Sequence, residues 1–177
     1  ALPILAKVLE AGAKFEQGRL KIGDKNINIL ELTIYNDGII VNGRHTDDAS
    51  IVMDDILVWG KKAFGLRDPE TKIARKYVSH VVVDFNKPID NALRGFDIIR
   101  RNLNDFYKQT YGTGVVYDLF RISLAIDPQA VPLHTFTEFG IERRVGVPYS
   151  KNRFFSVAPL TTKAHLSLLE VVEREFG

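Results

Sequence analysis

Short apolar stretches with alternating polar residues outnumber the helical stretches of this sequence, and tight turns separate several of them. Apolar residues at every second position are typical of half-buried strands. Strands that follow one another through tight turns pair antiparallel, because a parallel pair needs a long crossover. We therefore predict an α+β fold: a mostly antiparallel sheet of about five to six strands covered by four helices. We expect a single domain over residues 1–177.

The expected strands are defined by their alternation and by the turns between them. The pair Asp37-Gly38 lies between two apolar runs and predicts a hairpin. Asp-Gly favours the type I′ turn, in which two successive residues have positive φ. The expected strand segments are residues 30–34, 39–41, 73–85, 115–126, 135–145 and 153–158, with a short additional one at 19–23.

Four segments carry apolar residues at helical spacing, namely residues 3–15, 47–64, 88–110 and a last one from about residue 161. Thr46 is the expected N-cap of the second segment, and Gly65 is its expected stop. In the third segment one set of apolar side chains is expected to face inward: Ile89, Leu93, Phe96, Ile99, Leu103 and Phe106.

The composition excludes several classes of chemistry. The chain has no cysteine, so it has no disulfide, no cysteine-ligated zinc, no iron–sulfur cluster and no thiol nucleophile. With 24 Lys and Arg against 22 Asp and Glu, the net charge of +2 gives little attraction to phosphate backbones or anionic membranes. No apolar run reaches the ~18 residues that span a bilayer. We expect a soluble, intracellular and cytoplasmic protein that needs no cofactor and binds no membrane.

Four aspartates near the start of the second helical segment suggest a metal site, but their spacing argues against one. Asp47 and Asp54 are seven residues apart, which is about 10.5 Å along a helix. Two carboxylates at that separation cannot bind one Mg²⁺ at about 2.1 Å. We therefore expect a solvated acidic face and no metal.

The histidines lack the spacing of a metal-binding or catalytic pair. We expect them at the surface or at caps: His45, His80, His134 and His165. His45 is near enough in sequence to Asp48 for the two side chains to approach each other. An enzyme with a dispersed polar site would use a general base, an orienting or metal-binding carboxylate and an anion clamp, and its candidate catalytic residues are His45, Asp48, Glu142 and Arg144.

Basic and aromatic residues lie close together around the last expected hairpin, and this composition suits stacking on single-stranded nucleic acid. The candidate binding residues are Arg143, Arg144, Lys151, Arg153 and Phe154. Arg143 and Arg144 point to opposite faces of a strand, so they do not form one patch. Glu138 and Glu142 share the face of Arg144 and can neutralise it or the cation Arg153 across the hairpin. A cross-strand charge ladder over core aromatics is the alternative interpretation.

The two terminal helices carry more apolar surface than one buried stripe needs. The first is apolar over most of its circumference, and the last has Leu166 and Val171 outside its inner stripe. We predict a non-enzymatic protein–protein interaction or assembly module that docks on another protein chain, or on itself as a homo-oligomer, through these helices. The alternatives are an enzyme with a dispersed polar site, and nucleic-acid binding through the hairpin 138–155.

Overall fold

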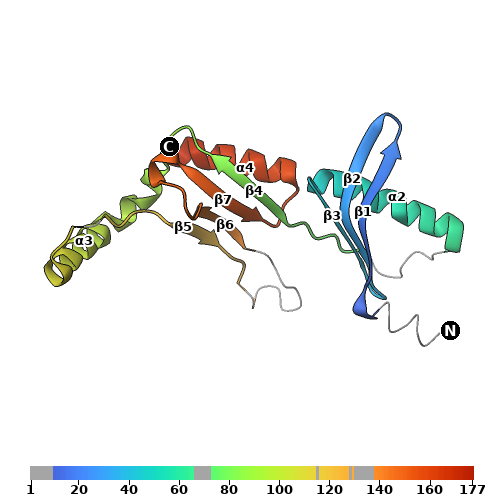
Figure 1. Ribbon diagram of the computed structural model, residues 1–177, viewed down its shortest axis with the longest axis horizontal. Coiled ribbons are helices and arrows are strands. Elements are labelled where there is room, and N and C mark those ends of the chain that lie inside the picture. Colours follow the sequence, from blue (N-terminus) through green and yellow to red (C-terminus); the bar gives the residue numbers. More distant parts are fainter. Residues whose placement is uncertain (1–9, 66–72, 115, 128, 130–137) are drawn as a thin grey trace. The chain divides into compact units, whose positions relative to one another are not determined.

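The structure is a computed structural model that describes residues 10–65, 73–114, 116–127, 129 and 138–177 (Figure 1). The chain divides into two compact units, Ala1–Tyr77 and Val78–Gly177. The single domain expected over residues 1–177 stays a prediction. Within the described residues, no helix is long and apolar enough to cross a membrane.

The first unit contains a three-stranded antiparallel sheet in the order β1-β2-β3. Its strands are β1 (Ala13–Ile22), β2 (Lys25–Ile34) and β3 (Ile39–Gly43). A two-residue turn, Gly23-Asp24, joins β1 to β2, and Gly23 takes a φ of 54° that few other residues tolerate. The turn therefore fixes the register of two ten-residue strands.

Helix α2 (Thr46–Phe64) follows β3 and packs against it. His45, not Thr46, occupies the N-cap position, and its side chain makes no capping hydrogen bond. Gly65 ends the helix in the left-handed conformation at φ 62°, as the sequence predicts. Within the described part of this unit, the buried apolar residues are Ile27 and Val52, so its core is small.

The second unit contains a four-stranded antiparallel sheet in the order β4-β7-β6-β5 (Figure 1). Its elements are β4 (Ser79–Asp84), the 3₁₀-helix η1 (Asp90–Phe96), α3 (Asp97–Tyr111), β5 (Arg121–Leu124), β6 (Phe139–Arg143), the 3₁₀ turn η2 (Tyr149–Lys151), β7 (Arg153–Ala158) and α4 (Thr162–Phe176).

The core of this unit lies between α4 and one face of the sheet. Leu169 and Val172 of α4 pack with residues of β6, β7 and the segments beside the sheet, which are Phe85, Ile89, Leu119, Ile141 and Phe154. Thr161 caps α4, because its side-chain oxygen accepts a hydrogen bond from the Ala164 N–H at 3.3 Å. The helix therefore begins directly after β7, with its apolar stripe on the sheet.

The α+β class with antiparallel sheets is confirmed, but the counts differ from the prediction. The described residues form seven strands in two sheets and three α-helices with full bounds, not four. The expected helix over residues 3–15 is wrong at its end, where residues 13–15 belong to β1; residues 1–9 lie outside the described part. Pairing with β2, from Ala13 opposite Ile34 onward, satisfies this backbone and overrides the helical spacing.

Three further expectations are corrected. The hairpin between β2 and β3 is present, but Asp37 and Gly38 do not have the positive φ of a type I′ turn, because four residues connect the strands instead of two. The segment 88–110 begins with η1 and becomes α-helical at Asp97. The strands expected at 73–85, 115–126 and 135–145 are shorter in the described residues, because pairing partners begin only at Ser79, Arg121 and Phe139.

Candidate functional site

Helix α3 has the sequence features of a stable amphipathic helix. Asp97 in its first turn and Lys108 in its last turn complement the helix dipole. Gly112 ends it at φ 70°, and the Gly112 N–H donates to the Lys108 carbonyl at 2.9 Å. The helix therefore extends to Tyr111.

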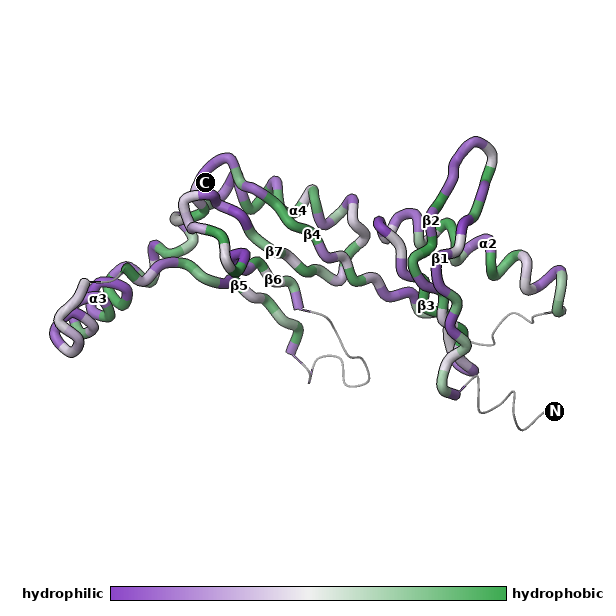
Figure 2. Tube along the Cα trace, viewed as in Figure 1, coloured by the Kyte–Doolittle hydropathy of each residue, from purple (hydrophilic) through white to green (hydrophobic). Residues whose placement is uncertain are grey.

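The apolar side of α3 is open to solvent. Three of its residues, together with Phe96 at its N-cap, have large exposed fractions: Phe96 56%, Ile99 54%, Leu103 43% and Phe106 63%. They recur at intervals of three and four residues, so they lie on one side of the helix, and we call them the α3 face. Figure 2 shows hydrophobic colour on α3, where the ribbon of Figure 1 leaves the sheet and α4. No residue of α3 is buried.

This exposure corrects the expectation that these four residues face inward. The helical spacing is present, but the element that α3 contacts most is η1, and the sheet of this unit is covered by α4. The earlier part of the stripe does turn inward: Ile89 is fully buried, and Leu93 packs against the core. The stripe is therefore buried around the start of η1 and exposed from Phe96, the last residue of η1, onward through α3.

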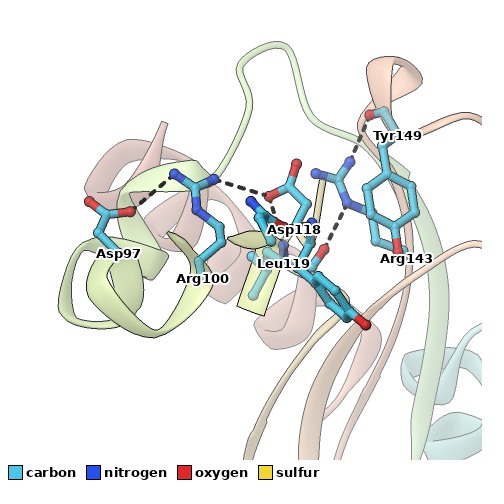
Figure 3. A network of polar contacts seen from close by, with 8 residues as sticks. Asp97, Arg100, Asp118, Leu119, Arg143 and Tyr149 are labelled. Carbon is cyan, nitrogen blue, oxygen red and sulfur yellow. Dashed lines mark hydrogen bonds and ion pairs between the residues drawn. The ribbon is translucent and has the colours of Figure 1, made fainter. Parts of the chain in front are cut away.

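The first turn of α3 is held by ion pairs (Figure 3). An Arg100 amino group lies 3.1 Å from the Asp97 carboxylate, and another lies 3.9 Å from that of Asp118. Asp118 also accepts a hydrogen bond from the Leu119 N–H at 2.7 Å. These contacts neutralise Arg100 within the chain and tie the start of the helix to the segment that returns to β5.

The returning segment also covers one side of α3. The Tyr117 N–H donates to the Asn104 side chain at 2.8 Å, and the Tyr117 ring meets Tyr107 with centroids 6.1 Å apart. Arg100, Asn104 and Tyr107 lie on one side of the helix, next to the α3 face. That side is therefore occupied by the chain itself, whereas the α3 face is about half exposed among the residues that the structure describes.

Arg143 is built into the core and is not available at the surface. It is 4% exposed, and its guanidinium lies 4.5 Å from the ring centroids of both Tyr149 and Phe154. It donates to the Leu119 carbonyl at 3.2 Å and to the Tyr149 carbonyl at 2.7 Å (Figure 3). Arg143 thus connects β6 to the segment before β5 and to η2, and the buried Phe154 offers no ring face to a base.

The other candidate binding residues are separated from one another. Arg144 and Lys151 are exposed. Arg153 forms a two-point ion pair with Asp84 of β4, at 2.6 and 2.7 Å. Within this unit the structure therefore does not assemble Arg143, Arg144, Lys151, Arg153 and Phe154 into one basic and aromatic patch.

The acidic residues of the same hairpin have a different partner from the one expected. Glu138 pairs with Arg121 of β5, and Glu142 lies 3.6 Å from the same guanidinium. The expected pairing with Arg144 or Arg153 is wrong, because β5 borders β6 and places Arg121 opposite Glu142. The positive charge beside Glu138 and Glu142 is therefore that of Arg121 on β5, a strand whose position next to the hairpin the sequence did not predict.

The candidate catalytic residues fall in both units. In the first unit His45 is exposed at the start of α2, and Asp48 pairs with Lys25 of β2 at 2.5 Å. Glu142 and Arg144 belong to the second unit. Neither unit by itself gathers the four. Within the described ranges, no group of three or more His, Asp or Glu residues could hold a metal ion.

His165 is buried, contrary to the expectation of a surface position. It is 0% exposed on the inner side of α4, and its Nε2 lies 2.8 Å from Ser156 Oγ. Ser156 Oγ donates to the Gly140 carbonyl at 2.8 Å, so Nε2–H of the imidazole must donate to Ser156. Burial lowers the pKa of His165, and the positive charge of His80 lowers that pKa further. The pair is enclosed and joins α4 to the sheet.

The α3 face is the feature that sequence reasoning placed incorrectly, because apolar residues at helical spacing do not tell whether another part of the chain covers them. Comparisons with protein-family models, curated proteins and solved structures give no match, so function is inferred from these residues and their geometry alone.

Proposed function

We propose that the protein is a non-enzymatic protein–protein interaction or assembly module, and that its contact surface is the α3 face. The observation that supports this proposal is the exposure of Phe96, Ile99, Leu103 and Phe106 on one side of a helix with no buried residue. Contiguous exposed apolar side chains on a helix mark a surface that another protein covers.

This proposal moves the contact surface away from the terminal helices. The last helix, α4, already buries its inner side on the sheet, through Leu169 and Val172. Outside that side it exposes two large apolar residues, Leu166 at 45% and Val171 at 37%, whereas the α3 face has four. The first helical segment lies almost wholly outside the described residues. Helix α3 is therefore the better supported surface.

A negative charge introduced into the α3 face tests the proposal. We expect Phe106→Asp to release the protein from its assembly, because a carboxylate in an apolar interface loses its hydration without gaining a partner. The measurement is the sedimentation coefficient of the tagged protein in an extract of the organism that produces it. Wild type should sediment as a particle heavier than the 20.0 kDa chain, and the variant as the chain alone.

Leu166→Asp on α4 is the matched control, because it places the same carboxylate on another exposed apolar site. It should sediment like wild type. A wild-type protein that sediments as a free chain would contradict the proposal. Release by Leu166→Asp but not by Phe106→Asp would return the contact surface to the terminal helix.

A further inference from the structure

We infer that the free edge of β4 binds an extended segment of another protein, which pairs antiparallel with β4 as an additional strand of the sheet. This site is a second contact surface and does not include the α3 face. Three features of the second unit support it: the direction of the β4 backbone groups, the position of α4 beside that edge, and the side chains that α4 presents there.

Strand β4 has hydrogen-bonding groups along one side that no described strand uses. The Phe85 N–H donates to the Asn152 carbonyl at 3.1 Å, so Phe85 faces β7, and so does every second residue back along β4. The residues between them direct their N–H and C=O groups away from β7. These residues are His80, Val82 and Asp84, and we call their backbone groups the β4 edge. In the described part of the chain β4 pairs with β7 alone.

The β4 edge is regular and lacks the usual protection of an edge strand. Its register with β7 is continuous over six residues, and it contains neither Lys nor Pro. The edge strands β5 and β3 have only four and five residues, and the pairing of β1 skips Gln17, which has a φ of 57°. Short length, bulges, Lys and Pro are the features by which edge strands avoid an added strand. Of these edges, β4 is therefore the best suited to accept one.

Helix α4 runs alongside β4 in the same direction (Figure 1). Where both elements start, the Ser79 hydroxyl donates to the Thr162 hydroxyl at 3.5 Å. Just after β4 ends, the Asn86 N–H donates to the Glu173 carboxylate near the end of α4. Thr162 therefore lies over β4, whereas His165 lies over β7, where it contacts the Ser156 hydroxyl.

One side of α4 therefore extends past the β4 edge. Successive residues are about 100° apart around a helix, so the direction from His165 to Thr162 continues beyond β4. Three residues lie in that direction: Glu173, Leu166 and Glu170. Leu166 is 45% exposed, and Glu170 is exposed as well. A hollow lies at the far end of this row, and it is lined by Asn86, Lys87, Glu170, Glu173 and Arg174. A strand added to the β4 edge would thus lie against Leu166 and Glu170.

The spacing of these two side chains defines the segment that fits. Leu166 and Glu170 are four residues apart on a helix, which is about 6 Å. Two residues on a strand span about 6.6 Å, so a basic and an apolar residue separated by one residue match Glu170 and Leu166. Antiparallel pairing follows the rest of this sheet. Because α4 and β4 run in the same direction, an antiparallel segment has the basic residue first.

A synthetic peptide with this pattern is the probe. Acetyl-Thr-Lys-Thr-Val-Thr-Val-Thr-amide carries a fluorescent label, and its anisotropy measures binding to the purified full chain. In the paired form the threonine N–H groups face β4, and the lysine and valine N–H groups face away. N-methylation of the two inner threonines should weaken binding about tenfold or more, because the β4 carbonyls lose their donors. N-methylation of the two valines is the matched control and should have little effect.

Amide hydrogen exchange shows where the peptide binds. The Val82 N–H should exchange more slowly with the peptide bound, whereas the Val81 N–H already faces β7 and should not change. Val82→Pro removes the Val82 donor and should weaken binding, since proline is tolerated where an edge N–H faces solvent. Val82→Ala keeps that N–H and is the matched control.

Substitutions on α4 test the side-chain contacts. Glu170→Lys should reverse the preference by a few-fold, so that it favours the peptide in which glutamate replaces lysine. Leu166→Asp should weaken binding of the original peptide. One added strand buries less than the ~1,200 Å² of a stable complex, so this contact is transient and does not hold the particle seen in the extract. Leu166→Asp should therefore lose the peptide and keep the particle, and Phe106→Asp should do the reverse.

Each other result overturns the inference in a defined way. Equal binding of the two N-methylated peptides would show that side chains alone hold the peptide. Tighter binding of the reversed sequence, Thr-Val-Thr-Val-Thr-Lys-Thr, would show parallel pairing. Protection of Val82 that rises with protein concentration, without peptide, would place a second copy on the β4 edge. No binding at millimolar peptide removes the site but leaves the proposed function, which depends on Phe106. A bound peptide without any Phe106-dependent particle removes the proposed function and leaves the site.

Discussion

Helices α3 and α4 are both fifteen residues long, belong to the same unit and are amphipathic, yet one is buried on its apolar side and the other is not. In α4 the buried residues are Thr162, His165, Leu169 and Val172. In α3 there are none. The comparison shows that helical periodicity predicts which side of a helix is apolar. It does not predict whether another element of the fold packs on that side.

The difference arises from what precedes each helix. Helix α4 starts directly after β7, and its capped first turn places the apolar stripe on the sheet. Helix α3 follows η1, and it is held at its start and along one side by ion pairs, a hydrogen bond and the ring contact between Tyr107 and Tyr117. These contacts orient α3 but leave the α3 face largely exposed.

The largest expected effect comes from one substitution made in both helices. Leu169→Ala should lower the free energy of unfolding by about 2–5 kcal/mol, because Leu169 is 3% exposed and its removal leaves a cavity in the core. Leu103→Ala should change it by about 0.5 kcal/mol or less, because Leu103 is 43% exposed. Urea denaturation followed by circular dichroism measures both, and equal losses would mean that α3 is packed like α4.

The sequence correctly predicted the helical periodicity of α3 and α4, but it correctly predicted the burial of the apolar side only for α4. In α4, Leu169 and Val172 are buried and Phe176 packs against the core, whereas Leu166 and Val171 lie outside this stripe, as the sequence predicts. The stripe of the segment 88–110 is continuous in sequence, and it becomes exposed at Phe96, where the helix type changes. A change from 3₁₀ to α geometry rotates the following residues, and no composition rule marks it.

Long-range pairing accounts for most of the other errors. Residues 13–15 have helical spacing, but β2 is available as a partner through the Gly23-Asp24 turn, and strand pairing prevails. The partner of Glu138 and Glu142 depended on β5 lying beside β6, which is a matter of strand order. The buried position of His165 depended on the Ser156 hydroxyl across the sheet. Each of these outcomes is a contact between distant residues that local spacing does not encode.

A second prediction concerns pH, and it applies to α4 alone because α3 has no histidine. The pKa of His165 is below its ordinary value in the folded state, so the unfolded chain takes up the proton first as pH falls. Stability should be constant above about pH 6.5 and should decrease below it, by about 1.4 kcal/mol for each unit by which the pKa is lowered. The decrease should end at the folded pKa.

His165→Gln tests this slope, because glutamine does not titrate. Between pH 7 and 5 the midpoint of urea denaturation should fall less in the variant than in wild type, whatever the stability of the variant at pH 7. His45→Gln is the control, since His45 is exposed at the start of α2, and it should keep the wild-type slope. Parallel slopes for wild type and His165→Gln would show that another group is responsible.

The smallest expected effect concerns the starts of the two helices. Thr161 caps α4 with its side chain, whereas Phe96 at the N-cap of α3 makes no side-chain hydrogen bond. Thr161→Ala should therefore lower stability by about 1 kcal/mol, and Thr161→Ser should restore most of it, because serine keeps the acceptor oxygen. Amide hydrogen exchange at Ala164 measures the loss locally, since that N–H donates to Thr161. Amide exchange in α3 should stay unchanged, because the Thr161 cap acts on α4 only. A matching increase of exchange in α3 would mean that the two helices unfold together. In that case the stability of α3 would depend on α4 more than the contacts of α3 show.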